Sequence, residues 1–211
     1  MTAAQRERRS LVETLRAVGP DAPTLCDGWT TRDLAAHLVV RERRPDATLG
    51  ISIPRLADYT AKVQNSVAQS TSWDELVDKI ASGPPIYSPF KLLDAVANLG
   101  EMFIHHEDVR RAAGPDGGWQ PRTLDASIAA PLRRQLALMS RVLLLKSPAQ
   151  VVLQTPTGDS IARAGRGEAV VTVTGEPQEL VLFVSGRDAV RVEFGGDPQA
   201  IAAVRGAPRG L

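Results

Sequence analysis

Apolar residues recur at intervals of three or four positions through most of the first 145 residues. Leu11 and Leu15, for example, stand among charged neighbours, and the helix-breaking pair Gly19 and Pro20 follows them. Residues three and four apart share one face of an α-helix, so this spacing predicts amphipathic helices. The predicted helices span residues 3–18, 31–44, 54–69, 72–80, 89–113 and 124–145. We expect the last of them to close a four-helix bundle.

The pattern changes after Pro148, where β-branched runs bounded by proline and glycine replace the helical spacing. Such runs are typical of strands. The predicted strands span residues 151–155, 159–163, 169–174 and 190–194. Short helices are expected at Pro177–Val184 and Asp197–Val204, each with a proline in its first turn. The fold class is therefore expected to be α+β, with a four-helix bundle over residues 1–147 and a small α/β domain over residues 148–211.

Charge and composition narrow the classes of function. The chain has 25 Lys and Arg against 24 Asp and Glu, so its formal charge of +1 gives no reason to bind nucleic acid or an anionic membrane. The single cysteine, Cys26, excludes an internal disulfide and a multi-cysteine metal site, and it suits a reducing compartment. The sequence shows neither a signal peptide nor a run of the ~20 apolar residues that span a bilayer. We therefore expect a cytoplasmic protein.

All three histidines fall in two predicted helices. Glu101 and His105 are four apart, so they project from one face of their helix, whereas His106 is rotated by about 100° from that face. His37 follows the apolar spacing of its own helix and is expected to point inward. Two alternatives carry no function: a core histidine bonded to a carbonyl or to Asp33, and a surface pair of Glu101 with His105.

If the two helices pack together, His37, Glu101 and His105 offer two imidazole nitrogens and a carboxylate to a single ion. Zn²⁺ and similar divalent ions accept such donors. Three protein ligands also leave a coordination position open, which is the pattern of a catalytic site rather than a structural one.

Three stretches of the sequence resemble a known family. Residues 25–38 read Leu-Cys-Asp-Gly-Trp-Thr-Thr-Arg-Asp-Leu-Ala-Ala-His-Leu, and residues 101–112 read Glu-Met-Phe-Ile-His-His-Glu-Asp-Val-Arg-Arg-Ala. Both are similar to the N-terminal domain of mycothiol-dependent maleylpyruvate isomerases and to the wider group of DinB-like metal-binding bundles. Residues 173–187, followed by Gly-Asp-Pro-Gln-Ala-Ile ending at Ile201, resemble the small, sterol-carrier-like α/β domain that follows the bundle in that family.

The resemblance implies a DinB-like four-helix bundle that binds a divalent metal, usually zinc, through His37, Glu101 and His105. It also implies that mycothiol, the low-molecular-weight thiol of actinobacteria, takes the open metal position and becomes a thiolate. On this basis we expect a divalent-metal-dependent, mycothiol-using enzyme that transfers a thiol to, or isomerises, a small electrophile. The alternatives are a metal-binding protein without thiol chemistry and a metal-dependent hydrolase with water at the open position.

Several other residues have two interpretations. Asp33 and Asp108 are each placed to accept a hydrogen bond from a neighbouring metal-binding imidazole, or else to act as a helix cap and a surface pair. Cys26 is expected to be a small buried thiol rather than a nucleophile, because no base adjoins it in sequence. His106 is expected to be structural or to lie at the rim of the pocket. The run Arg41–Arg44 is interpreted as a solvated helix end.

The resemblance also implies a role for an arginine near the C-terminus. Arg187 is placed in the family pattern to hold an anionic substrate and is our candidate catalytic residue; a solvent-exposed arginine is the alternative. Arg110 and Arg111 are expected to form salt bridges. The expected partners are a small-molecule thiol and a small electrophile, with no nucleic acid and no membrane, and the chain is expected to be a monomer or a homodimer.

Overall fold

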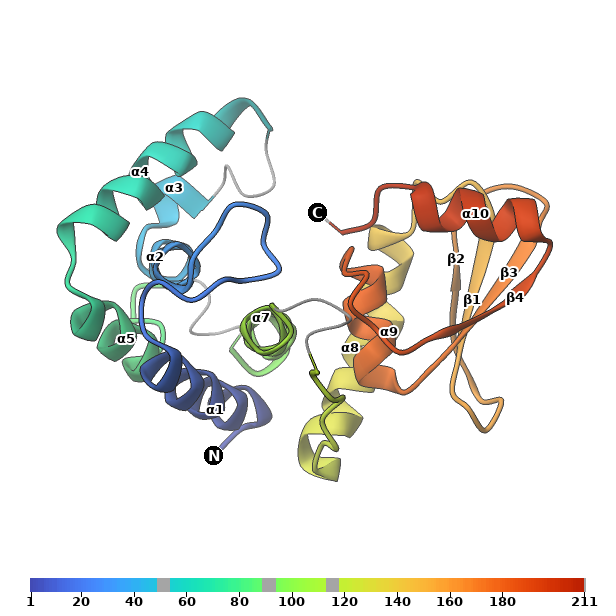
Figure 1. Ribbon diagram of the computed structural model, residues 1–211, viewed down its shortest axis with the longest axis horizontal. Coiled ribbons are helices and arrows are strands. Elements are labelled where there is room, and N and C mark those ends of the chain that lie inside the picture. Colours follow the sequence, from blue (N-terminus) through green and yellow to red (C-terminus); the bar gives the residue numbers. More distant parts are fainter. Residues whose placement is uncertain (49–53, 89–93, 113–117, 211) are drawn as a thin grey trace. The chain divides into compact units, whose positions relative to one another are not determined.

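The computed structural model describes residues 1–48, 54–88, 94–112 and 118–210. The chain divides into two compact units, Met1–Trp119 and Gln120–Leu211 (Figure 1). The first is helical and the second combines helices with one sheet. The predicted α+β class, with a helical bundle followed by a small C-terminal domain, is therefore confirmed. Among the described residues, no helix is both long and apolar enough to cross a membrane.

The first unit is a bundle of helices. It contains α1 (Ala3–Val18), α2 (Thr31–Arg43), the short α3 (Pro45–Thr48), a 3₁₀ turn η2 (Pro54–Leu56), α4 (Ala57–Ser70), α5 (Trp73–Ser82) and α7 (Asp94–Arg110). Helix α1 packs along α7, and α2 contacts both α4 and α5. The start predicted for α7 at Pro89 lies outside the described residues. From Asp94 onward, the predicted helix is confirmed.

Local sequence signals set the ends of the first two helices. Thr2 and Gln5 form a capping box at the start of α1, in which each side chain accepts a hydrogen bond from the other residue's backbone N–H. Gly19 follows the last residue of α1 with a φ of 79°, a conformation that glycine adopts without steric cost. Thr30 caps α2 together with Asp33. These caps end α1 at Val18 and begin α2 at Thr31.

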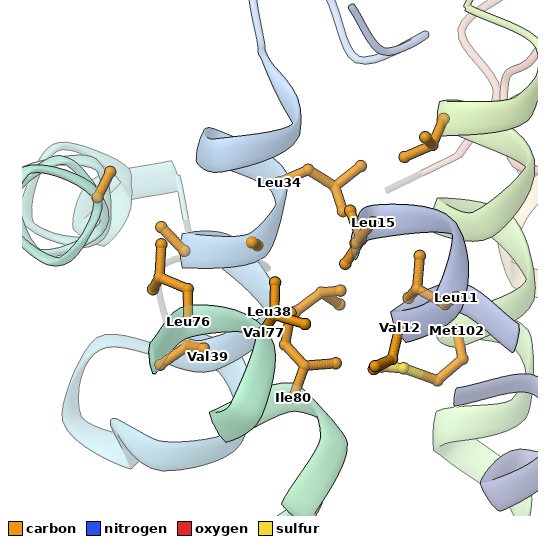
Figure 2. Close-up of a cluster of buried hydrophobic side chains, with 14 residues drawn as sticks. Leu11, Val12, Leu15, Leu34, Leu38, Val39, Leu76, Val77, Ile80 and Met102 are labelled. Carbon is orange, nitrogen blue, oxygen red and sulfur yellow. The ribbon is translucent and has the colours of Figure 1, made fainter. Parts of the chain in front are cut away.

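The core of the first unit lies where α1, α2, α5 and α7 meet (Figure 2). Leu11 and Leu15 of α1 are fully buried, as the spacing predicts, and so are Leu34 and Leu38 of α2. Met102 of α7 belongs to the same cluster. Burying a side chain of this size contributes about 1.5–3 kcal/mol relative to exposure. Helices α2 and α7 thus contribute to one core, which fixes the positions of the polar residues that both helices carry.

The second unit holds a four-stranded mixed sheet in the order β2-β1-β3-β4. Its elements are α8 (Ala126–Leu143), β1 (Gln150–Gln154), β2 (Ser160–Ala164), β3 (Val170–Thr174), α9 (Pro177–Val184), β4 (Glu193–Gly196) and α10 (Pro198–Gly206). Strand β1 pairs antiparallel with β2 and parallel with β3, and β4 pairs antiparallel with β3. Val151 and Leu153 of β1 and Val171 and Val173 of β3 are fully buried, so one face of the sheet is a core.

The division of the chain differs from the expected boundary at residue 147. Helix α8 packs against α9 and β2, and its buried residues, among them Leu132 and Leu136, belong to the second unit. The first compact unit ends at Trp119, before α8, so it does not include the helix that was expected to close the bundle. The change in sequence character near Pro148 marks the start of the sheet rather than the start of a domain.

Strand β4 also begins later than predicted, at Glu193 instead of Val190. The backbone N–H of Arg191 donates to Glu179 Oε2 at 2.8 Å, which ties the preceding segment to α9. An N–H used in this way is not available for a strand ladder. The β-branched pattern alone does not reveal this side-chain acceptor.

Candidate metal centre

The three residues proposed as metal ligands converge in the first unit. His37 lies in the middle of α2, and Glu101 and His105 lie one turn apart on α7. Glu101 Oε1 is 3.4 Å from His37 Nε2 and 3.2 Å from His105 Nε2. One donor atom from each residue lies within 4.8 Å of the others. A turn of α7 thus supplies two donors, and the packing of α2 supplies the third.

Both imidazoles are oriented by an acceptor at their other nitrogen. His37 Nδ1 is 3.3 Å from Gln64 Oε1, and His105 Nδ1 is 2.9 Å from Asp108 Oδ2. An acceptor at Nδ1 keeps the ring proton there and leaves the Nε2 lone pair free to bind a cation. Both histidines are buried, so few alternative orientations are open to their rings.

The charges of the site depend strongly on each other. Burial disfavours the charged form of Glu101, but hydrogen bonds from His105 and His37 and the charge of Arg41 outweigh it, so the pKa of Glu101 lies well below its usual value. Burial likewise disfavours protonated His105, but the hydrogen bond to Asp108, with contributions from Cys26 and Glu101, raises the pKa of His105 well above its usual value. The raised pKa means that His105 keeps its second ring proton to a higher pH than an ordinary histidine, and this proton competes with a cation for the ring nitrogen.

Arg41 is a residue of this site that the sequence interpretation missed. The prediction of a solvated helix end is wrong for Arg41, which is 8% exposed. Its Nε is 3.3 Å from Glu101 Oε1, and its guanidinium donates to Asn98 Oδ1 at 2.6 Å. Arg44, by contrast, is exposed and pairs with Asp46. The spacing of four residues from His37 was the available signal, since it puts Arg41 on the same face of α2.

The two aspartates turn out to have different roles. Asp33 accepts hydrogen bonds from the backbone N–H and the hydroxyl of Thr30, at 2.9 and 2.7 Å, and is thus a helix cap. Asp108 is fully buried and accepts from His105, so for this residue the interpretation as a partner of the imidazole holds. Gln64 fills the corresponding position beside His37. It lies on α4, and nothing in the local sequence pattern links it to His37.

Cys26 and His106 lie on different sides of α7. Cys26 is partly buried, and its thiol donates to Asp108 Oδ2 at 3.3 Å. His106 is buried with Nδ1 2.7 Å from Glu7 Oε1 and Nε2 2.9 Å from the hydroxyl of Thr14. Its contacts join α7 to α1, which confirms the structural interpretation of His106.

The predicted arginine pairs are found on α7. Arg110 pairs with Glu107 at 2.8 Å, and Arg111 pairs with the same carboxylate at 2.6 Å, so both expected salt bridges are confirmed. Arg187 belongs to the second unit, where it follows α9 and donates to the carbonyl oxygen of Ser185 at 2.6 Å. Its role toward a substrate stays a prediction.

Comparison with known proteins relates this geometry to a family. Two solved structures, one of the mycothiol-dependent maleylpyruvate isomerase and one of a point mutant of it, match with a TM-score of 0.54 over 92% of this chain and 90% of theirs. Both proteins are 14% identical to this chain in sequence, so the comparison shows a similar fold only. This fold agrees with the predicted DinB-like architecture. No curated protein sequence matches the chain. The family described as the mycothiol maleylpyruvate isomerase N-terminal domain matches residues 1–137, and this chain belongs to that family.

Proposed function

We propose that this protein is a divalent-metal-dependent enzyme that uses mycothiol to transfer a thiol to, or to isomerise, a small electrophile. The observation that carries the proposal is the convergence of His37, Glu101 and His105, with both Nε2 atoms directed at one carboxylate oxygen. Membership of the family supports the thiol and a small-molecule substrate. Zn²⁺ is the metal we expect in the site.

The donor set fits a divalent cation. Two imidazole nitrogens and one carboxylate oxygen are ligands that zinc accepts, and three protein ligands leave room for an exogenous one. Hydrogen-bonded partners behind both imidazoles are the usual support of such ligands. When bound, a divalent metal lowers the pKa of a coordinated thiol, so that a thiolate is available near neutral pH.

Residues of the chain supply orientation around this centre. Asp108 and Gln64 hold the rings of His105 and His37 by their Nδ1 atoms. Arg41 contacts the Glu101 oxygen that faces both rings, and it restricts the rotation of that carboxylate. Because the ligands are held before the metal arrives, little side-chain entropy is lost on binding.

We also propose, from the family resemblance, that Arg187 holds an anionic group of the electrophile. A guanidinium binds a carboxylate through two parallel hydrogen bonds, which a lysine ammonium does not reproduce. An Arg187→Lys variant should therefore raise KM for an anionic substrate while leaving metal content unchanged. An unchanged KM would remove Arg187 from the proposal.

Metal analysis tests the centre itself. The purified protein is expected to hold one divalent ion per chain, and His37→Ala is expected to lose it. A His106→Gln variant is the matched control, because it changes a buried histidine on α7 that lies outside the donor set. If the unmodified protein binds no divalent metal under conditions that keep it folded, the proposal fails.

Titration of the cobalt-loaded protein with mycothiol tests the thiol. Direct coordination of a thiolate is expected to add a sulfur-to-metal charge-transfer band to the cobalt spectrum. A spectrum that stays unchanged at saturating thiol would contradict the thiol-dependent function. In that case hydrolysis by a bound water, or metal binding alone, would be the better explanation.

A further inference from the structure

The connection between α1 and α2 touches both candidate metal-binding histidines. The ring of Trp29 lies against that of His37, with centroids 5.2 Å apart, and the sulfur of Cys26 lies 4.0 Å from His105 Nδ1. A short segment thus reaches both rings from outside the donor set. Its sequence motif contributed to the family resemblance, but the proposed function gives it no role.

The segment is braced by its own hydrogen bonds. The hydroxyl of Thr24 accepts from the backbone N–H of Cys26 at 3.1 Å and donates to the carbonyl oxygen of Trp29 at 2.9 Å. The N–H of Trp29 donates to the carbonyl oxygen of Cys26 at 3.0 Å. Pro23 and Thr30 close the segment as an isolated antiparallel bridge. This bracing fixes the backbone from which the Cys26 side chain extends.

The segment is attached to α7 at Asp108 through two hydrogen bonds. The backbone N–H of Leu25 donates to the carbonyl oxygen of Asp108 at 3.0 Å, and the thiol of Cys26 donates to Oδ2 at 3.3 Å. The same Oδ2 accepts from His105 Nδ1 at 2.9 Å. A buried carboxylate is costly unless donors surround it, and each donor it accepts restricts its rotation.

We propose that Cys26 is a positioning residue that acts through Asp108 on His105. The thiol, as donor, holds the carboxylate in the rotation that meets the imidazole, and the carboxylate in turn holds Nε2 toward Glu101. This inference rests on the proposed metal centre. It assigns Cys26 neither a metal bond nor a nucleophilic step, because the thiol is protonated and donates its hydrogen to Asp108.

The test is metal affinity across a double-mutant cycle. Asp108→Asn is expected to weaken binding by about 10- to 100-fold, the usual effect of removing such a partner. Cys26→Ala is expected to weaken it by about two- to fivefold, since a thiol is a weak donor. Cys26→Ser restores an O–H donor and should bind nearly as the unmodified protein does. In the Asp108→Asn background, Cys26→Ala should have no further effect, because residues acting in series are not additive.

Three results would overturn the inference: equal affinity for Cys26→Ala and the unmodified protein, additive effects in the double variant, or no recovery in Cys26→Ser. Circular dichroism of each variant separates loss of metal affinity from loss of folding. If the unmodified protein itself binds no metal, the proposed function fails instead.

A measurement without metal tests the same link. Cys26 is the chain's only cysteine, so one infrared S–H stretching band reports on it, and Cys26→Ser removes that band. In the metal-free protein the band should show a hydrogen-bonded thiol and move toward that of a free thiol in Asp108→Ala, which removes both carboxylate oxygens. A band at the same position in both proteins would disprove the contact.

Discussion

Helix α7 carries buried charge on two of its faces, and the partners of the two histidines differ. On the first face His106 has Glu7 at Nδ1 and Thr14 at Nε2, so both ring nitrogens are bonded to side chains of α1. Nearby, Glu107 is fully buried and pairs with both Arg110 and Arg111. In each of these contacts, one side chain supplies the hydrogen-bond or charge partner that the other side chain requires.

On the second face, donors converge on one point instead of pairing off. His105 uses Nδ1 to bond Asp108, while its Nε2 and that of His37 both face Glu101 Oε1. The two adjacent histidines therefore differ in the environment of Nε2: in His106 it is bonded to a hydroxyl of α1, whereas in His105 it faces the same carboxylate oxygen as a second imidazole. Burial and charge alone do not distinguish a structural cluster from a candidate site, whereas the direction of the Nε2 atoms does.

The largest effect is expected on the first face. Arg111 is fully buried, bonded to Glu107 and stacked 4.3 Å above the ring of Trp119. Arg111→Ala removes one of the two guanidinium partners of the buried Glu107 and leaves a cavity beside Trp119, so it should lower the free energy of unfolding by about 2–5 kcal/mol. Urea denaturation measures this, and the metal stoichiometry of the folded fraction should not change. Full stability in this variant would show that the pair is dispensable.

The next effect is expected on the second face. His105→Ala removes a proposed ligand, so metal affinity should fall by more than about 100-fold, the upper end of the loss expected when a hydrogen-bonded partner of a ligand is removed. His106→Ala, one residue later, should lose stability but bind metal with the affinity of the unmodified protein. Isothermal titration with Zn²⁺ distinguishes them. If the two variants lost the same amount of metal affinity, the distinction between a structural face and a metal-binding face of α7 would be wrong.

Metal binding on the second face should depend on pH. The pKa of His105 in the metal-free protein is raised, so its proton competes with the metal. Below that pKa, each unit of acidification should cost about tenfold in affinity, and above it the dependence should level off. The stability of the metal-free protein should depend on pH in the opposite direction, because the raised pKa means that the folded state favours protonated His105. This contribution to stability is fully present below the usual histidine pKa of about 6.5 and is lost as the pH rises through the raised pKa. Titrations across this range test both slopes.

The smallest effect is expected at Gln64. Gln64→Leu fills a similar volume but removes the acceptor at His37 Nδ1, and metal affinity should fall by about tenfold. Gln64→Glu keeps an acceptor and is the matched variant, expected to bind at least as tightly. If the leucine variant binds as the unmodified protein does, packing alone orients His37.

Local spacing predicted the parts of the site that lie on one helix. The interval from Glu101 to His105 and the inward direction of His37 follow from helical periodicity. The other partners in the site were not predictable in this way, because the contacts of Gln64 with His37 and of Arg41 with Glu101 each join two different helices of the folded bundle. The pairing of Asp108 with His105 was readable as an alternative, since three residues separate them on α7.

The fold shows the same limit. Helix positions followed from apolar spacing, but the spacing of α8 does not say which partner its apolar face covers. That face packs in the second unit, so the change in sequence pattern near Pro148 does not coincide with the division between the two compact units.

The position of α8 has a practical consequence for anyone who trims or recombines this protein. The family match ends at residue 137, inside α8, whereas the compact bundle ends at Trp119. A fragment cut at the end of the match would carry the first two thirds of α8, whose Leu132 and Leu136 would have lost the surface that buries them. The exposed apolar face of this partial helix would promote aggregation. A chimera of two relatives is best joined just before Gln120, where it leaves both cores whole.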